Sequence, residues 1–214
     1  MDIFERIKET GIIPVIKLEN TEDAEELGRV LVRGGIPIAE VTFRAKGAAE
    51  VIKTMAEQIP ELTVGAGTVL TTEQADEAIA AGAKFIVSPG FNRRVVQHVI
   101  DKGLPMIPGC MTPSEIEQGL ELGLDVLKFF PAEASGGMKM IKAMSGPYGG
   151  VKFIPTGGIN KDNLAAYLSS DKILAVGGSW MVKSDLLKER QFDEVERLCL
   201  EAVKIKEQIR WAKK

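Results

Sequence analysis

The chain has 214 residues, of which 45% are hydrophobic and 27% are charged, and its formal net charge is −3 at pH 7. This length and apolar content predict one globular domain over residues 1–214. The small negative charge gives no sign of a nucleic-acid partner, the apolar runs are too short to span a bilayer, and the amino-terminus lacks a signal-peptide pattern, so we expect a cytoplasmic protein without a membrane partner.

Short apolar runs alternate along the chain with segments of helical periodicity. A first helix is expected at Asp2–Glu9. Strands are expected to begin near Ile12, Ile36, Leu62, Phe85, Leu104, Asp125, Val151 and Ile173. The helices between and after them are expected at Thr21–Arg33, Ala48–Gln58, Thr72–Ala81, Arg93–Lys102, Pro113–Leu122, Gly137–Met144, Lys161–Leu168 and Phe192–Lys204. Eight strand-helix units favour an α/β fold of the (β/α)8 type, a TIM barrel, over an open doubly wound sheet.

Three polar residues mark expected helix starts. Asn20, Thr112 and Asn160 each stand just before an expected helix. Their side-chain oxygens can accept hydrogen bonds from free N–H groups of the first turn. We therefore expect helices to begin directly after them.

Two strands carry ionisable residues on one face. In the second strand, the more polar face holds Ile38, Glu40, Thr42 and Arg44. In the sixth strand, Lys128 and Phe130 alternate with the apolar Leu127 and Phe129. If the apolar faces pack under the outer helices, Glu40 and Lys128 point into the barrel and meet there.

Lys128 stands in the apolar run from Val126 to Ala132. Burying an ammonium ion is costly unless the ion is paired or loses its proton. A neutral buried amine is the nucleophile that forms a Schiff base with a carbonyl substrate. Two alternatives stay open at this point. The aliphatic part of the Lys128 side chain could pack in the core while its ammonium group reaches solvent, or Lys128 could form a structural ion pair with Glu40. Lys17, at the end of the first strand, has polar neighbours and is expected to be solvated or to clamp a substrate.

Glycine pairs end the seventh and eighth strands. Gly157–Gly158 and Gly177–Gly178 stand where many barrels bind phosphate through N–H groups at helix N-termini, and Ser179 could add a hydroxyl. A tight strand-to-helix turn is the alternative for each pair. Together, at these two positions, the pairs favour a phosphate site.

A cofactor or metal is not expected. The segment Gly65–Leu70 begins like a dinucleotide fingerprint, but Leu70 stands where the third glycine is needed. Cys110 and Cys199 have no metal-ligand spacing, and the single histidine, His98, is expected on the surface of a helix.

Six blocks of sequence between Ile12 and Val182 form a further pattern: Glu40–Arg44, Gly65–Val69, Ser88–Gly90, Leu127–Glu133, Pro155–Ile159 and Gly177–Trp180. In this order they resemble the 2-keto-3-deoxy-6-phosphogluconate (KDPG) and 4-hydroxy-2-oxoglutarate (KHG) aldolases. The resemblance implies a metal-independent class I aldolase on a (β/α)8 barrel, typically a homotrimer. Lys17 departs from an arginine found in some relatives, and the Cys110–Met111 loop varies among them.

The resemblance also implies roles for individual residues. Lys128 resembles the Schiff-base lysine and Glu40 the general acid/base. Arg44, Thr68 and Pro89 resemble the residues that surround the pyruvyl carboxylate, and Phe130 resembles the ring packed beside the imine. Thr156 resembles a position that contacts substrate hydroxyls. The positions similar to the phosphate site are Gly157, Gly158, Gly178 and Ser179.

The expected activity is that of a lyase that reversibly cleaves 2-dehydro-3-deoxy-6-phosphogluconate, another name for KDPG, to pyruvate and D-glyceraldehyde 3-phosphate. It is also expected to cleave KHG to pyruvate and glyoxylate. One alternative is a sugar-phosphate isomerase or epimerase, which would have no reason to bury Lys128. Another is a non-catalytic barrel that senses a metabolite, in which Lys128→Arg would leave ligand binding intact. The gluconate and galactonate forms of the substrate differ only in the stereochemistry of one hydroxyl, and the sequence does not distinguish between them.

Overall fold

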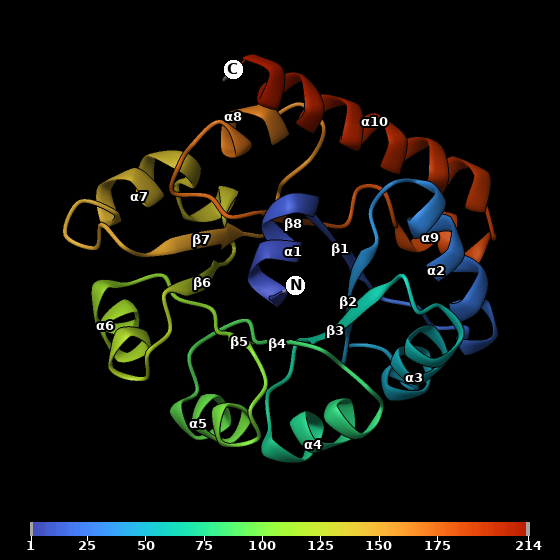
Figure 1. Ribbon diagram of the computed structural model, residues 1–214, viewed down its shortest axis with the longest axis horizontal. Helices are drawn as coiled ribbons and strands as arrows, with labels where there is room; N and C mark the ends of the chain where they lie inside the picture. Colours follow the sequence, from blue (N-terminus) through green and yellow to red (C-terminus); the bar gives the residue numbers. More distant parts are fainter. Residues whose placement is uncertain (1, 213–214) are drawn as a thin grey trace.

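A computed structural model of the protein describes residues 2–212, in which parallel strands form a ring inside a layer of helices (Figure 1). The strands are β1 (Ile12–Ile16), β2 (Ile38–Thr42), β3 (Thr63–Gly67), β4 (Ile86–Val87), β5 (Met106–Ile107), β6 (Val126–Phe129), β7 (Lys152–Pro155) and β8 (Val176–Gly178). The expected (β/α)8 barrel is confirmed.

Most of the helices lie between consecutive strands. They are α1 (Ile3–Thr10), α2 (Ala24–Arg33), α3 (Ala48–Gln58), α4 (Thr72–Ala80), α5 (Arg93–Asp101), α6 (Pro113–Glu121), α7 (Gly137–Met144), α8 (Leu164–Leu168), α9 (Ser184–Lys188) and α10 (Phe192–Ala212), with short 3-10 helices at Thr21–Asp23 and Glu133–Ser135. α9 was not predicted, and α10 continues beyond its predicted end at Lys204. Residues 213 and 214 lie outside the described part of the chain.

Backbone pairing closes the ring at two seams. One sheet has the order β5-β4-β3-β2-β1-β8, and β6 and β7 form the other. At the first seam, Lys128 N donates to Pro108 O at 2.9 Å and Cys110 N donates to Lys128 O at 2.8 Å. At the second seam, Thr156 pairs with Gly177. The backbone of Lys128 is therefore part of the joint between β5 and β6.

The amino-terminal end of the ring is covered by α1. Figure 1 shows this helix across the middle of the ring, and Gly11 alone separates it from β1. Ile7 of α1 is fully buried. The opposite end, where the parallel strands finish, carries the loops that form active sites in barrels of this kind.

The strands alternate as their sequences predicted. Leu127 faces α6, since a Cβ placed on Gly119 would lie 3.1 Å from its Cδ2 atom. Lys128, the next residue, consequently points into the ring, where its Nζ donates to Glu40. The expectation that Glu40 and Lys128 share the barrel interior is confirmed.

Two of the three predicted helix starts agree with the structure. Thr112 and Glu115 form a capping box at the start of α6, and the Asn20 side chain accepts a hydrogen bond from Glu22 N. The prediction for Asn160 was wrong, because α8 begins only at Leu164. The Asn160 side chain instead accepts from Asp162 N within the loop, at 2.9 Å.

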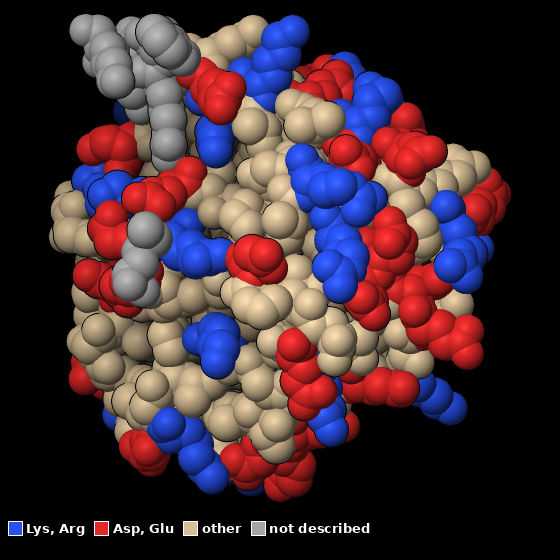
Figure 2. Space-filling model, turned by 45° about the vertical axis from the view of Figure 1, so that its right-hand side comes forward, with Lys and Arg blue, Asp and Glu red and all other residues tan. Residues whose placement is uncertain are grey.

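Acidic and basic side chains are interspersed on the face that Figure 2 presents. Ion pairs also join neighbouring helices: Arg33 of α2, for example, lies 2.9 Å from Glu196 of α10. In the described part of the chain, every helix is too short or too polar to cross a lipid bilayer.

Candidate active site

A cavity of about 360 Å³ opens at the carboxyl ends of the strands. Its walls are formed by Val15, Glu40, Arg44, Thr68, Pro89, Lys128, Phe130, Thr156, Gly157, Gly158, Ile159, Gly178 and Ser179. The structure thus brings together all eleven residues that the sequence singled out for catalysis and for substrate and phosphate binding. Val15 and Ile159 were missed, because apolar side chains at strand ends look like ordinary core residues.

Lys128 and Glu40 form a buried polar contact in the wall of this cavity. Lys128 Nζ lies 3.2 Å from Glu40 Oε1, and the two side chains expose only 6% and 3% of their surface. The Phe130 ring lies beside the amine, with 5.5 Å between Nζ and the ring centroid. A carboxylate within reach of a buried amine can take and return protons during a reaction at that nitrogen.

Gly67 provides the space that Glu40 occupies. A Cβ on Gly67 would lie 2.2 Å from Glu40 Oε1 and 2.6 Å from its Cγ. Gly65 has a separate packing role, because a Cβ there would lie 2.4 Å from the Phe85 ring. These close approaches explain both glycines of the segment that begins like a dinucleotide fingerprint.

Arg44 reaches the cavity rim from the end of β2. Its Nε donates to Thr42 Oγ1 at 3.3 Å, and the buried Thr42 hydroxyl donates to Ile16 O at 2.8 Å. Thr68 and Pro89 line the same cavity from the loops after β3 and β4. A guanidinium and a hydroxyl at one rim suit a carboxylate group on a ligand.

Thr156 carries a hydroxyl without a protein partner. Its Oγ1 atom is buried and makes no hydrogen bond within the described residues. A Cβ on Gly177 would lie 2.3 Å from this oxygen, so the glycine leaves the hydroxyl its place. A buried polar atom that lines a cavity is suited to pair with a ligand, since leaving it unpaired is costly.

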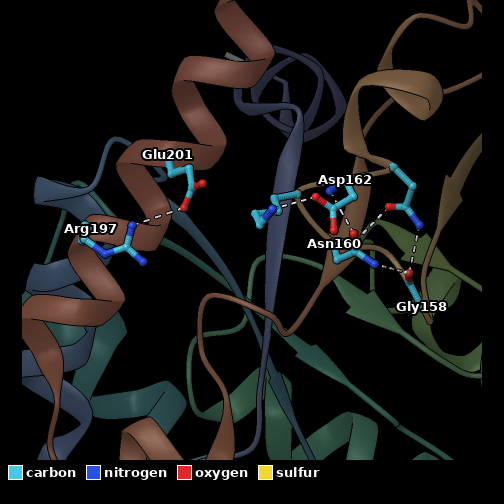
Figure 3. Close-up of polar contacts among 7 residues, drawn as sticks. Gly158, Asn160, Asp162, Arg197 and Glu201 are labelled. Atoms are coloured by element: carbon cyan, nitrogen blue, oxygen red, sulfur yellow. Dashed lines mark hydrogen bonds and ion pairs between the residues drawn. The ribbon is translucent and has the colours of Figure 1, made fainter.

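The loop after β7 turns through two glycines in left-handed conformations, Gly157 with φ +99° and Gly158 with φ +80°. The expected helix N-termini are absent here, because α8 starts at Leu164 and α9 at Ser184, and Gly178 belongs to β8. The N–H groups of Gly158 and Ile159 nevertheless have no hydrogen-bond acceptor within residues 2–212. Figure 3 shows how this loop folds back on itself.

Lys17 lies beside the main cavity, in an adjoining hollow of about 440 Å³. Its Nζ is 2.8 Å from Glu19 Oε1, and its side chain is 37% exposed. Lys17, together with Lys188, holds the pKa of the Glu19 carboxyl below its usual value. Lys17 is therefore partly solvated and ion-paired, unlike Lys128.

The cysteines and the histidine lie apart from the cavity walls. Cys110 and Cys199 are buried free thiols, and His98 pairs with Asp76 at 2.9 Å on the outer helices. Met111, beside Cys110, is 36% exposed. Within residues 2–212, there is no group of three or more His, Cys, Asp or Glu side chains arranged to hold a metal ion.

Comparison with known proteins gives a consistent result. A family model described as "KDPG and KHG aldolase" matches residues 3–198. A 2-dehydro-3-deoxy-phosphogluconate aldolase of Treponema pallidum is 49% identical, over 95% of this chain and 97% of its own. Two solved structures are each 38% identical to this chain and cover 94% of it. One is a KDPG aldolase from Legionella pneumophila with pyruvate captured as a covalent carbinolamine intermediate (TM-score 0.91, 98% of that chain). The other is the Zymomonas mobilis 2-keto-3-deoxy-6-phosphogluconate aldolase with 3-phosphoglycerate (TM-score 0.87, 94% of that chain).

Proposed function

This chain belongs to the KDPG and KHG aldolase family, and we propose that Lys128 is the residue through which it cleaves KDPG to pyruvate and D-glyceraldehyde 3-phosphate. The observation that carries this assignment is the buried contact between Lys128 Nζ and Glu40 Oε1, 3.2 Å apart in the wall of the cavity. The covalent carbinolamine of pyruvate in the Legionella pneumophila relative supports a lysine-based route.

The reaction begins at the C2 ketone of the substrate. The neutral amine of Lys128 attacks this carbon, and the resulting carbinolamine loses water to give a protonated imine. Glu40 shuttles the protons of these steps, directly or through a water, because its carboxylate is the acid/base group beside the nitrogen. The positive imine then serves as the electron sink for cleavage.

Cleavage breaks the bond between C3 and C4. A base, for which we propose Glu40, removes the proton of the C4 hydroxyl, and the bond electrons move to the imine nitrogen to form an enamine. D-glyceraldehyde 3-phosphate leaves as the aldehyde. The enamine is reprotonated at C3, and hydrolysis of the imine releases pyruvate and restores the lysine.

The remaining cavity residues position the substrate. We propose that Arg44 and Thr68 bind the pyruvyl carboxylate, with Pro89 beside it. The Phe130 ring packs against the imine, and the Thr156 hydroxyl meets a substrate hydroxyl. The phosphate would bind at the far end, where Gly157, Gly158, Gly178 and Ser179 line the cavity. The Zymomonas mobilis relative, with its bound 3-phosphoglycerate, supports a phosphorylated ligand. Binding energy at that end holds the reacting carbons against Lys128.

KHG cleavage to pyruvate and glyoxylate would use the same imine. Because this substrate has no phosphate, it forgoes the contacts at the glycine loop, and we expect a higher KM for it than for KDPG. From the family we also propose a cytoplasmic homotrimer, which light scattering would detect as a mass three times the 23.2 kDa of one chain.

Borohydride reduction in the presence of pyruvate tests the role of Lys128. The imine would be trapped as a stable adduct, and peptide mass spectrometry should find it on the peptide that carries Lys128. Lys128→Arg should abolish both adduct and turnover. Lys152→Arg is the matched control, because this strand lysine lies at the start of β7 and donates to Asp171 O. A folded wild-type protein without the adduct would reject the proposal in favour of an isomerase or a sensor.

A further inference from the structure

We propose that Asn163 is a positioning residue for substrate phosphate, acting through the backbone of Gly158. The inference rests on the proposed function, since it assumes that the loop after β7 binds the phosphate. Asn163 is outside the set of cavity-lining residues. It therefore affects the substrate only by setting the shape of the loop.

The Asn163 side chain joins two points of this loop. Its Nδ2 donates to Gly158 O at 3.0 Å, and its Oδ1 accepts from Asn160 N at 2.9 Å. Figure 3 shows two contacts that meet at Gly158, and the one from the labelled Asn160 is the longer, with 3.3 Å between Asn160 Nδ2 and Gly158 O. The two ends of one amide thus fix the distance between Gly158 and Asn160.

These contacts determine which backbone groups of the loop remain available to a ligand. The Gly157 carbonyl accepts from Glu133 N at 3.1 Å, and the Gly158 carbonyl accepts from the two asparagine amides. The carbonyl oxygens, which would repel an anion, are thereby paired with the protein. The N–H groups of Gly158 and Ile159 are left without acceptors in the described chain, and successive free N–H groups of this kind bind anions.

Asn163 is better placed than Asn160 to hold this arrangement. It directly precedes α8, so its backbone is fixed by the helix that follows. Asn160 lies within the loop, and its Oδ1 is already used by Asp162 N. Without Asn163, the Gly158 carbonyl would keep only the longer bond from Asn160. The N–H groups of Gly158 and Ile159, two residues that line the cavity, would then lose their fixed geometry.

The test compares a phosphorylated substrate with a ligand that has no phosphate. Asn163→Ala should raise the KM for KDPG about tenfold, the factor expected for the loss of one hydrogen bond to the phosphate, with little change in kcat. Borohydride trapping of pyruvate should proceed at the wild-type rate, because pyruvate makes no phosphate contact. Asn92→Ala is the control: Asn92 directly precedes α5, as Asn163 precedes α8, but its side chain accepts from Arg94 N at 3.1 Å and lies outside the cavity walls. It should leave both readouts unchanged.

The possible outcomes separate the proposals. An unchanged KM for KDPG, or a parallel loss of KDPG cleavage and pyruvate trapping, would overturn the positioning role. If Asn163→Ala fails to fold, Asn163→Ser serves instead, because serine keeps a polar group before α8 but is too short to join Gly158 and Asn160. A wild-type protein that traps no pyruvate would reject the proposed function itself and this inference with it.

Discussion

Replacing Gly67 with alanine should remove most of the activity, although no catalytic residue is substituted. The new Cβ would lie 2.2 Å from Glu40 Oε1 and 2.7 Å from its Cδ, whereas ordinary contact begins at 3.4 Å. The carboxylate must therefore retreat by about 1 Å from its place beside Lys128. Such a displacement in an active site costs about 10²-fold in rate, equivalent to about 2.7 kcal/mol in activation free energy.

The assay is steady-state KDPG cleavage, with pyruvate release coupled to lactate dehydrogenase. Gly67→Ala should lower kcat about 10²-fold, and thermal unfolding should show that the variant remains folded at the assay temperature. Gly149→Ala is the control, because a Cβ there meets no atom within 4 Å. It should behave like the wild type.

A double-mutant cycle tests whether the effect passes through Glu40. In a Glu40→Ala background the clash disappears, so adding Gly67→Ala should change the residual kcat by less than about threefold. A wild-type kcat in the single variant, or a full additional loss in the double variant, would refute the reasoning that Gly67 acts by making room for the carboxylate.

Three further predictions concern buried groups. Lys128→Met leaves the Glu40 carboxylate buried without its partner, so it should lower the free energy of unfolding, measured in urea, by about 3 kcal/mol. The double variant Lys128→Met, Glu40→Gln should recover most of this loss. Thr156→Val removes a buried hydroxyl that has no partner, so the free protein should be at least as stable as the wild type. The kcat/KM for KDPG should fall, whereas pyruvate trapping should persist. A loss of stability would contradict this prediction. Burial raises the pKa of the Cys110 and Cys199 thiols to about 12, so the folded protein should resist Ellman's reagent at pH 8. Because the unfolded thiols ionise near their ordinary pKa of 9.0, stability should fall between about pH 9 and 12, and a flat profile there would refute the burial argument.

The barrel and the direction of the catalytic side chains were predictable from sequence because both follow from periodicity. Strand residues alternate between faces, so the placement of Leu127 against the helices fixed Lys128 inside. The start of α6 was equally predictable, because Thr112 and Glu115 form a capping box at its first turn. In each case, the signal and the structure that it specifies lie within a few residues of each other.

Other features depend on contacts that no local pattern encodes. Asn160 has the same type of signal as Thr112, yet α8 begins later because the asparagines of this loop bond to one another and to Gly158. The five-residue helix α9 has no N-capping side chain, so the sequence carries no local signal for its start. From the sequence, Gly67 could equally be a glycine required by a turn. Its role depends on Glu40 of the neighbouring strand, whose side chain occupies the space beside it.

The contact between Lys128 and Glu40 also bears on how the protein folds. The two residues are 88 positions apart in sequence and come from β6 and β2, on opposite sides of the ring. A partly assembled intermediate, however rich in helix, cannot bring them together, and long-range contacts of this kind form slowly. Recovery of enzymatic activity during refolding should therefore lag behind recovery of circular dichroism, which makes catalysis a direct measure of ring closure.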